Sequence, residues 1–190
     1  LELAAQLAAG AAPSPARIVV PIGSTCTTAG LLAGTALAGA LGVWPGALPI
    51  IHAVRVTPWP VTSRLRTARL AQRTLALIAA RGGPRHAPGL AALARRLIVD
   101  GAELGGGYGR TTPACEAARR AIRHPRLDAV YAGKAAAALL RLSQAGHAPL
   151  LLWATKSSAR VPPPSAAAIA HAPPVLARWL TRAATLGPAE

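Results

Sequence analysis

The chain has 190 residues, of which 52% are hydrophobic and 14% are charged. This composition suffices for one domain with a substantial core and excludes a wholly disordered protein. The formal net charge is +15, but the basic residues are spread along the chain and aromatic residues do not alternate with them. We therefore interpret the charge mainly as a solvated surface and expect no nucleic-acid partner, with nucleic-acid binding kept as the alternative.

The cysteines and histidines argue against two kinds of site. Cys26 and Cys115 are the only cysteines, and the five histidines are scattered without metal-ligand spacing. We therefore expect no metal site and no disulfide scaffold. No signal-peptide pattern is visible, and prolines and glycines interrupt the charge-free stretch between Arg17 and Arg55. These features predict a cytoplasmic protein without a membrane span.

The chain contains no methionine and begins in a helix-like pattern without a cap, so we expect a fragment or a processed product. The first elements in order are a helix end at 1–10, a strand at 17–22, a polar turn at 23–28 and a helix at 29–41. In this helix Gly30, Gly34 and Ala38 recur every four residues, which predicts a flat face for close packing.

A second strand is predicted at 48–56, followed by a helix at 64–80 that Thr62 and Ser63 can cap. The apolar positions expected to face the core from this helix are Leu65, Ala68, Leu70, Leu75 and Ile78. The remaining elements in order are a short helix at 90–96, a strand at 97–99, helices at 112–123 and 135–144, a strand at 150–153 and a helix at 174–184.

This alternation of strands and helices predicts an α/β fold with three layers and a mainly parallel sheet. We expect residues 1–160 to form one domain and residues 161–190 to form a Pro-rich turn and a C-terminal helix. Ligands of such sheets bind at the carboxyl ends of the strands, and three polar turns are predicted to lie near such ends.

The first of these turns is Gly23-Ser-Thr-Cys-Thr-Thr-Ala-Gly30, between a buried strand and a helix. Free backbone N–H groups and the positive end of the helix favour a phosphate there, and Ser24, Thr25, Thr27 and Thr28 add hydroxyl groups. No lysine follows the glycines, so the turn is not a Walker A loop. On these residues alone, an ordinary Ser/Thr helix cap explains the turn better than a phosphate site does.

The second and third turns carry the other candidate site residues. Tyr108 and Tyr131, the only tyrosines, lie in the glycine-bearing segments Gly107-Tyr-Gly109 and Tyr131-Ala-Gly-Lys134. A phenol can donate a hydrogen bond or transfer a proton, but each ring could also be an ordinary packed tyrosine. Thr155 follows the last strand and could present its hydroxyl to a ligand or bond its own backbone.

The order of these motifs resembles the aminocyclopropanecarboxylate deaminase / D-cysteine desulfhydrase family of pyridoxal 5′-phosphate (PLP) enzymes. The resemblance spans residues 17–158, which correspond to the C-terminal part of a family member. It implies part of a tryptophan synthase β-like fold (fold type II), a small amino-acid substrate and, for full-length members, a homodimer. It also implies that Ser24, Thr25, Cys26 and Thr27 hold the PLP phosphate, that Thr155 lies by the cofactor, and that Tyr108 and Tyr131 are the catalytic tyrosines.

Several positions depart from the family pattern. Thr25 and Cys26 replace a more Gly-rich pair, and Ala132 stands where members place a residue facing the pyridine nitrogen. The family's Schiff-base lysine lies in the N-terminal half, whereas the first lysine here is Lys134, which does not match it. We therefore expect this chain alone to be inactive. The alternative is a non-catalytic basic α/β domain that binds a phosphate-bearing ligand or nucleic acid, and deaminase and desulfhydrase both stay open.

Overall fold

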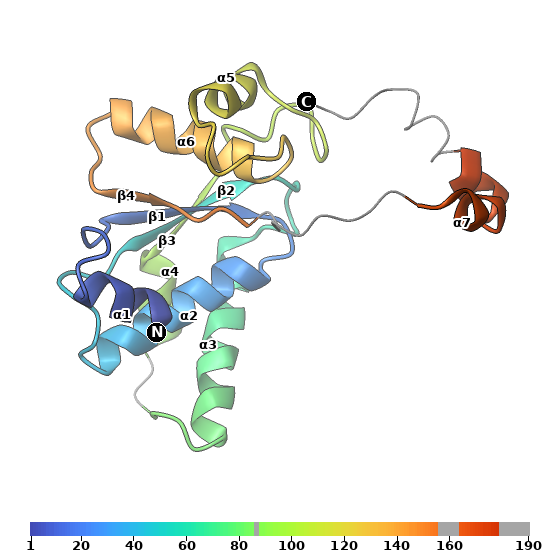
Figure 1. The fold of residues 1–190 in the computed structure, drawn as a ribbon. Helices are drawn as coiled ribbons and strands as arrows, with labels where there is room; N and C mark the ends of the chain where they lie inside the picture. Colours follow the sequence, from blue (N-terminus) through green and yellow to red (C-terminus); the bar gives the residue numbers. More distant parts are fainter. Residues whose placement is uncertain (86–87, 156–163, 179–190) are drawn as a thin grey trace. The chain divides into compact units, whose positions relative to one another are not determined.

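The computed structural model describes residues 1–85, 88–155 and 164–178. The chain divides into two compact units, Leu1–Lys156 and Ser157–Glu190. The first unit holds a sheet with helices on both of its faces (Figure 1). In the second unit, α7 spans Ala166–Ala170 and residues 174–178 are also helical. The remainder of the helix predicted at 174–184 lies outside the described residues.

The sheet has four strands in the order β3-β2-β1-β4, and every pairing is parallel. β1 lies inside the sheet, where Arg17 is in register with Ile50 of β2 and with Leu150 of β4. The predicted α/β fold with a parallel sheet is therefore confirmed. The strands are β1 (Arg17–Ile22), β2 (Ile50–Arg55), β3 (Leu97–Asp100) and β4 (Leu150–Leu152).

Helices cover the two faces of the sheet unequally. Four helices lie on one face, and two lie on the other (Figure 1). The first group is α1 (Glu2–Ala8), α2 (Cys26–Ala40), α3 (Arg64–Ala80) and α4 (Leu90–Arg95). The second group is α5 (Pro113–Ala121) and α6 (Ala132–Gln144).

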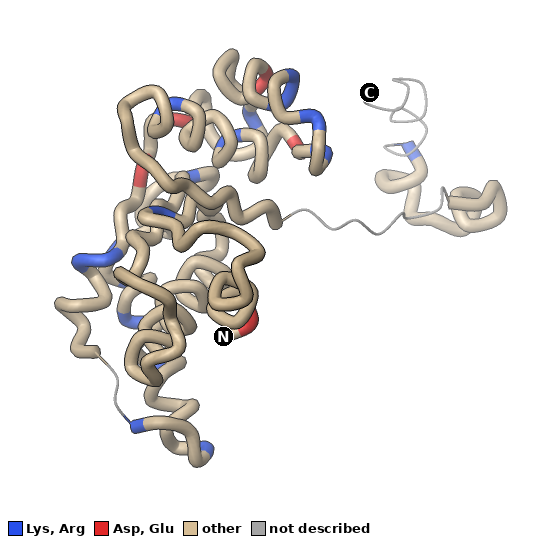
Figure 2. Tube along the Cα trace, turned by 60° about the vertical axis from the view of Figure 1, so that its left-hand side comes forward, with Lys and Arg blue, Asp and Glu red and all other residues tan. Residues whose placement is uncertain are grey.

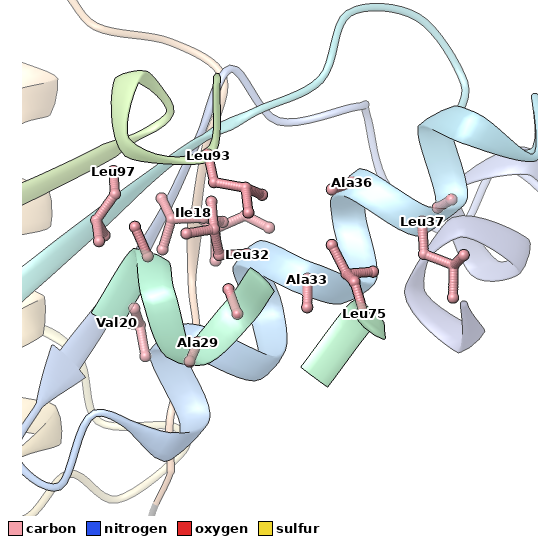
Figure 3. Packing of buried hydrophobic residues seen from close by; sticks show 14 of the residues in the cluster. Ile18, Val20, Ala29, Leu32, Ala33, Ala36, Leu37, Leu75, Leu93 and Leu97 are labelled. Atoms are coloured by element: carbon pink, nitrogen blue, oxygen red, sulfur yellow. The ribbon is translucent and has the colours of Figure 1, made fainter. Parts of the chain in front are cut away.

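The alternating directions of strand side chains produce two cores. Ile18, Val20 and Ile22 of β1 pack with the helices of the first group, and Val19 packs towards α6. Figure 3 shows Ile18 near Leu32 of α2 and Leu97 of β3, and Val20 near Ala29 of α2. Because a parallel sheet is covered on both faces, nearly every residue of β1 is apolar and buried.

Two helices begin earlier than the sequence predicts, and both starts matter for the candidate site. α2 begins at Cys26 rather than residue 29, and α6 begins at Ala132 rather than residue 135. Residues 26–28 are therefore the first helical turn of α2, so their backbone N–H groups lie at a helix N-terminus, where no intrahelical acceptor exists for them.

The prediction for the buried face of α3 is partly wrong. Leu65 and Leu70 are 44% and 36% exposed, whereas Thr67 and Ala71 are buried beside Ala68 and Leu75. The helix turns small side chains towards α2, because a close approach of two helices leaves little room for leucine. The larger leucines consequently remain at the surface.

The prediction of close packing at Gly30 and Gly34 is also wrong. A Cβ atom at either position would meet nothing within 4 Å, although Ala38 is buried. A helical glycine that close packing does require is Gly133 in α6. A Cβ there would lie 2.6 Å from the carbonyl oxygen of Asp128 and 2.8 Å from Sγ of Cys115.

Charge is distributed unevenly along the first unit. No acidic residue occurs between Glu2 and Asp100, whereas arginines occur on or next to several elements of that segment (Figure 2). In the parts of the chain that the structure describes, no helix combines the length and the apolar character needed to cross a bilayer.

Substituting these glycines tests the packing. We expect Gly133→Ala to lower the free energy of unfolding by about 1–3 kcal/mol, because a backbone carbonyl cannot move aside cheaply. Gly34→Ala should instead raise it by about 0.5–1 kcal/mol, because alanine favours a helix and has free space there. Urea unfolding followed by circular dichroism measures both values. Equal effects of the two substitutions would contradict the packing around Gly133.

Candidate functional site

A small hollow lies at the carboxyl ends of β1 and β4. It has a volume of about 140 Å³. Its walls come from three separate segments, namely the end of β1 with the first turn of α2, the start of α6, and the residues after β4. The lining residues are Pro21, Gly23, Ser24, Thr25, Thr27, Thr28, Tyr131 and Thr155.

The N-terminus of α2 forms the floor of this hollow. Thr25 is the N-cap residue with a φ of 73°, the single non-glycine residue with positive φ among those that the structure describes. A left-handed conformation is unfavourable for a β-branched residue and is typically retained at functional sites. This conformation lets the helix begin directly at Cys26.

Thr28 supplies an unusual polar group at the same place. Its side chain is 1% exposed, and its hydroxyl has no hydrogen-bond partner in the described structure. Buried hydroxyls almost always have a partner. Thr28 also lines the hollow, so a ligand there would lie next to this residue.

Gly23 and Tyr131 bring the first two polar turns into contact. A Cβ atom at Gly23 would lie 3.2 Å from Cε1 of the Tyr131 ring, so only a glycine leaves the ring its full space. The carbonyl oxygen of Gly23 also accepts a hydrogen bond of 3.2 Å from Oγ1 of Thr57, after β2. The turn is thereby attached to the neighbouring strand.

Asp128 fixes the start of α6 and thereby the position of Tyr131. Its carboxylate accepts hydrogen bonds from the backbone N–H groups of Val130, Tyr131 and Ala132, at 2.9, 2.6 and 3.0 Å. An acidic side chain at a helix N-terminus also interacts favourably with the helix dipole. This role was not predicted, because the helix was expected only from residue 135 and Asp128 lies well before that position.

The two tyrosines form a direct pair. Their hydroxyl oxygens are 2.8 Å apart, and the rings meet edge to face with centroids 6.2 Å apart. Tyr108 is 57% exposed. The hydrogen bond with Tyr108, followed by burial, raises the pKa of Tyr131 above its ordinary value. Tyr131 therefore holds its proton at neutral pH and can donate a hydrogen bond towards the hollow or to Tyr108.

Lys134 supports the loop that carries Tyr108. Its side chain is fully buried, and its Nζ donates a hydrogen bond of 2.8 Å to the carbonyl oxygen of Leu104. Burial lowers the pKa of this amine. The amine is therefore held by the backbone of the 101–109 loop and does not line the hollow.

The structure brings most of the predicted site residues together. Ser24, Thr25, Thr27, Thr155 and Tyr131 line one hollow, and Tyr108 reaches it through Tyr131. Cys26 is exposed beside the hollow without lining it, and its Sγ approaches the carbonyl oxygen of Ser24 at 3.8 Å. Ala132 is buried among apolar residues of α5 and α6 and does not line the hollow either.

A second polar cluster lies on the α6 side of the sheet, and sequence reasoning missed it. His52 of β2 is buried, and its Nε2 lies 2.9 Å from Oδ2 of Asp100 at the end of β3. Arg141 of α6 also bonds Asp100, and its Nε lies 3.7 Å from Oε1 of Glu103. The hydrogen bond from His52, with a further contribution from Arg141, lowers the pKa of Asp100 far below its ordinary value.

This cluster links distant parts of the chain. It joins β2, β3 and α6, whose residues are far apart in the sequence. Within the described ranges, no group of three or more His, Cys, Asp or Glu side chains has the arrangement needed to hold a metal ion.

Comparisons with known proteins support the fold. The chain is similar to a solved structure described as a crystal structure analysis of the ACC deaminase homologue, with 21% identity and a TM-score of 0.54. The similarity covers 80% of this chain and 42% of that chain. This chain thus corresponds to less than half of the neighbour, and the likeness is one of fold. No family model and no curated protein match the chain.

The tyrosine pair can be tested by titration. We expect Tyr108→Phe to lower the pKa of Tyr131 towards its ordinary value of about 10, because the hydrogen bond that raises it is removed. The variant retains one tyrosine, so NMR of ring-labelled tyrosine follows a single group across the alkaline range. The wild-type chain is the reference, and an unchanged or higher pKa in the variant would contradict the pairing.

The Asp100 cluster predicts how stability depends on pH. A carboxyl group whose pKa is lowered in the folded state stabilises it above the unfolded pKa of about 4, and this contribution is lost as pH falls further. We expect Asp100→Asn to lower the free energy of unfolding by roughly 1–3 kcal/mol at pH 7. Below pH 4 the free energy of unfolding of this variant should fall less steeply than that of the wild-type chain. Urea unfolding at several pH values measures this. Glu2→Gln, at an exposed carboxylate of α1, is the control that should retain the wild-type profile.

Proposed function

We propose that this chain binds PLP through its phosphate and forms part of the active site of a PLP-dependent enzyme acting on a small amino acid. The observation that carries the proposal is the convergence of three distant polar segments on one hollow with a helix N-terminus as its floor. The ACC deaminase-like fold supports it. Aminocyclopropanecarboxylate and D-cysteine are the substrates that the sequence resemblance implies.

The residues of the hollow fit a phosphate. Its volume of about 140 Å³ is below the roughly 300 Å³ at which drug-sized ligands are enclosed, so a phosphate fits while the rest of the cofactor lies outside. Neither an acidic nor a basic side chain lines the hollow. Backbone N–H groups at the start of α2, the helix dipole and the hydroxyls of Ser24, Thr27 and Thr28 would supply the attraction.

The tyrosine pair lies at the edge of the phosphate site, where the reacting part of a substrate would be. When bound, PLP supplies an electron sink for chemistry at the α-carbon of an amino acid. Tyr131 would contribute a hydrogen bond from a phenol that stays protonated at neutral pH, and Tyr108 would orient that proton through the contact of 2.8 Å. The resemblance matches Thr155 to a position that is threonine in desulfhydrases and leucine in deaminases. Thr155 therefore favours desulfhydrases over deaminases.

Among the residues that the structure describes, none fits the covalent attachment of PLP. Lys134 is fully buried, and its amine is bonded to the carbonyl oxygen of Leu104. Lys156, the other lysine of the chain, lies outside the described residues. We therefore propose that Lys134 takes no part in the chemistry and that this chain alone is inactive. In full-length relatives the site would be completed by further segments and by assembly as a homodimer in the cytoplasm.

A non-catalytic domain that binds a phosphate-bearing ligand is the second candidate. The unpartnered hydroxyl of Thr28 favours it, because that group requires only a phosphate oxygen. Both candidates predict phosphate binding. They differ in whether the pyridine ring adds affinity, so pyridoxine 5′-phosphate and inorganic phosphate have to be compared.

Cys26 provides a built-in reporter for this test. It is exposed beside the hollow, whereas Cys115 is buried, so a thiol reagent should modify Cys26 selectively. We expect inorganic phosphate and pyridoxine 5′-phosphate to slow the modification and unphosphorylated pyridoxine to have no effect. Stronger protection by pyridoxine 5′-phosphate than by phosphate supports the PLP site, and equal protection supports the second candidate. Equal rates with and without phosphate would contradict both.

Thr28→Val separates binding from stability in the same assay. Replacing a buried hydroxyl without a partner by a methyl group should leave stability unchanged or slightly higher, because no hydrogen bond is lost. Protection by phosphate should require about tenfold more ligand, since a hydrogen bond to a charged group contributes about 1.5 kcal/mol. Thr74→Val, at a helical threonine of α3 that bonds the carbonyl oxygen of Leu70, is the matched control and should keep normal protection.

A further inference from the structure

A second pocket, larger than the hollow, lies at the other end of α2. Its volume is about 470 Å³, and it opens between the C-terminal half of α2, the residue Leu48 and helix α4. It shares no lining residue with the hollow at the start of α2. Figure 3 shows Ala36 of α2 and Leu93 of α4, which contribute to its wall. The lining residues are Ala36, Ala40, Leu48, Pro88, Ala92, Leu93 and Arg96.

Arg96 is the one polar residue in this lining. Its Nη2 donates hydrogen bonds to Oγ1 of Thr35 at 2.9 Å and to the carbonyl oxygen of Pro49 at 3.0 Å. Its Nε is buried without a partner. Nη1 is not among the buried atoms without a partner, and no described residue forms a hydrogen bond with it. It is therefore the guanidinium nitrogen that remains available to a ligand.

The charge of Arg96 has no counter-ion within the described structure. None of the ion pairs includes it, and both of its hydrogen-bond acceptors are uncharged. No acidic residue precedes it apart from Glu2 (Figure 2), and the nearest one along the chain, Asp100, already pairs with His52 and Arg141. Burial lowers the pKa of Arg96. Removing a cation from water is unfavourable, and a nearby anion offsets this cost.

We propose that this pocket binds a small amphipathic carboxylate, such as a medium-chain fatty acid, with its carboxylate at Arg96 and its hydrocarbon chain against Ala36, Leu48 and Leu93. The volume lies in the range of pockets that enclose small ligands. One available guanidinium nitrogen matches a singly charged head group. A phosphate ester carries more charge and more acceptor oxygens than this lining can satisfy.

The ligand series that tests this uses octanoate and 1-octanol, both below their aggregation limits, with the wild-type chain. We expect octanoate to bind about tenfold more tightly than octanol, because the carboxylate gains a charge-assisted hydrogen bond. Affinity should rise about fourfold for each methylene from hexanoate to octanoate as apolar surface is buried. Isothermal titration calorimetry measures these affinities, and equal affinities of octanoate and octanol would overturn the proposal.

Three variants locate the site. Ala92→Leu fills the pocket from α4 and should abolish octanoate binding, while Arg96→Gln should remove the preference for octanoate over octanol. Arg95→Gln changes the exposed neighbour of Arg96 in the last turn of α4 and should bind octanoate normally. If Arg95→Gln weakens binding as much as Arg96→Gln, the attraction is a general effect of positive charge and the proposal fails.

Arg96 also connects α2 with the segment before β2, so its replacement could unfold the chain. Circular dichroism melting of each variant identifies such a loss. The comparison of octanoate with octanol in the wild-type chain needs no substitution and decides the proposal by itself. Because the pocket and the phosphate hollow share no residue, octanoate should leave the protection of Cys26 by phosphate unchanged, so the two proposals can fail separately.

Discussion

The parallel pairing of β1 with both β2 and β4 is the constraint on which the candidate site depends. Strands that run in the same direction end at the same edge of a sheet, so the turn after β1 and Thr155 after β4 meet there although more than a hundred residues separate them. The hydrogen bond between Thr57 and Gly23 attaches the residues after β2 to the same edge. The site is therefore a consequence of strand order, and each of its side chains comes from a segment that would be unremarkable alone.

Strand order places the backbone of the site, and helix starts place its functional groups. Thr25 adopts the left-handed conformation that allows α2 to begin at Cys26, and this directs the first backbone N–H groups of the helix towards the hollow. Asp128 accepts three backbone N–H groups at the start of α6 and holds Tyr131 against Gly23. Because both arrangements are local, a single substitution at either helix start should alter the site without disturbing the sheet.

The regular elements could be predicted from the sequence because their patterns are local. The bounds predicted for β1 and α3 coincide with the observed Arg17–Ile22 and Arg64–Ala80. The starts of α2 and α6 were predicted too late, because a β-branched residue with positive φ and a three-fold carboxylate cap leave little trace in apolar periodicity. The outward position of Leu65 and Leu70 and the contact of His52 with Asp100 depend on neighbours distant in sequence. The order of the motifs along the chain predicts that the three polar turns form one site. No single motif predicts this.

The described part of this chain has the groups for phosphate recognition but no free amine for covalent chemistry with PLP. Phosphate recognition needs backbone N–H groups, hydroxyls and a helix dipole, all of which one strand–turn–helix unit supplies. Covalent chemistry with PLP needs a reactive amine next to the cofactor, and the one lysine that the structure describes is buried and holds the loop of Tyr108 in place. Moving Lys134 to a cofactor would break the hydrogen bond that positions one of the proposed catalytic tyrosines. The same residue therefore cannot serve both purposes, and the amine in an active assembly has to come from elsewhere than Lys134.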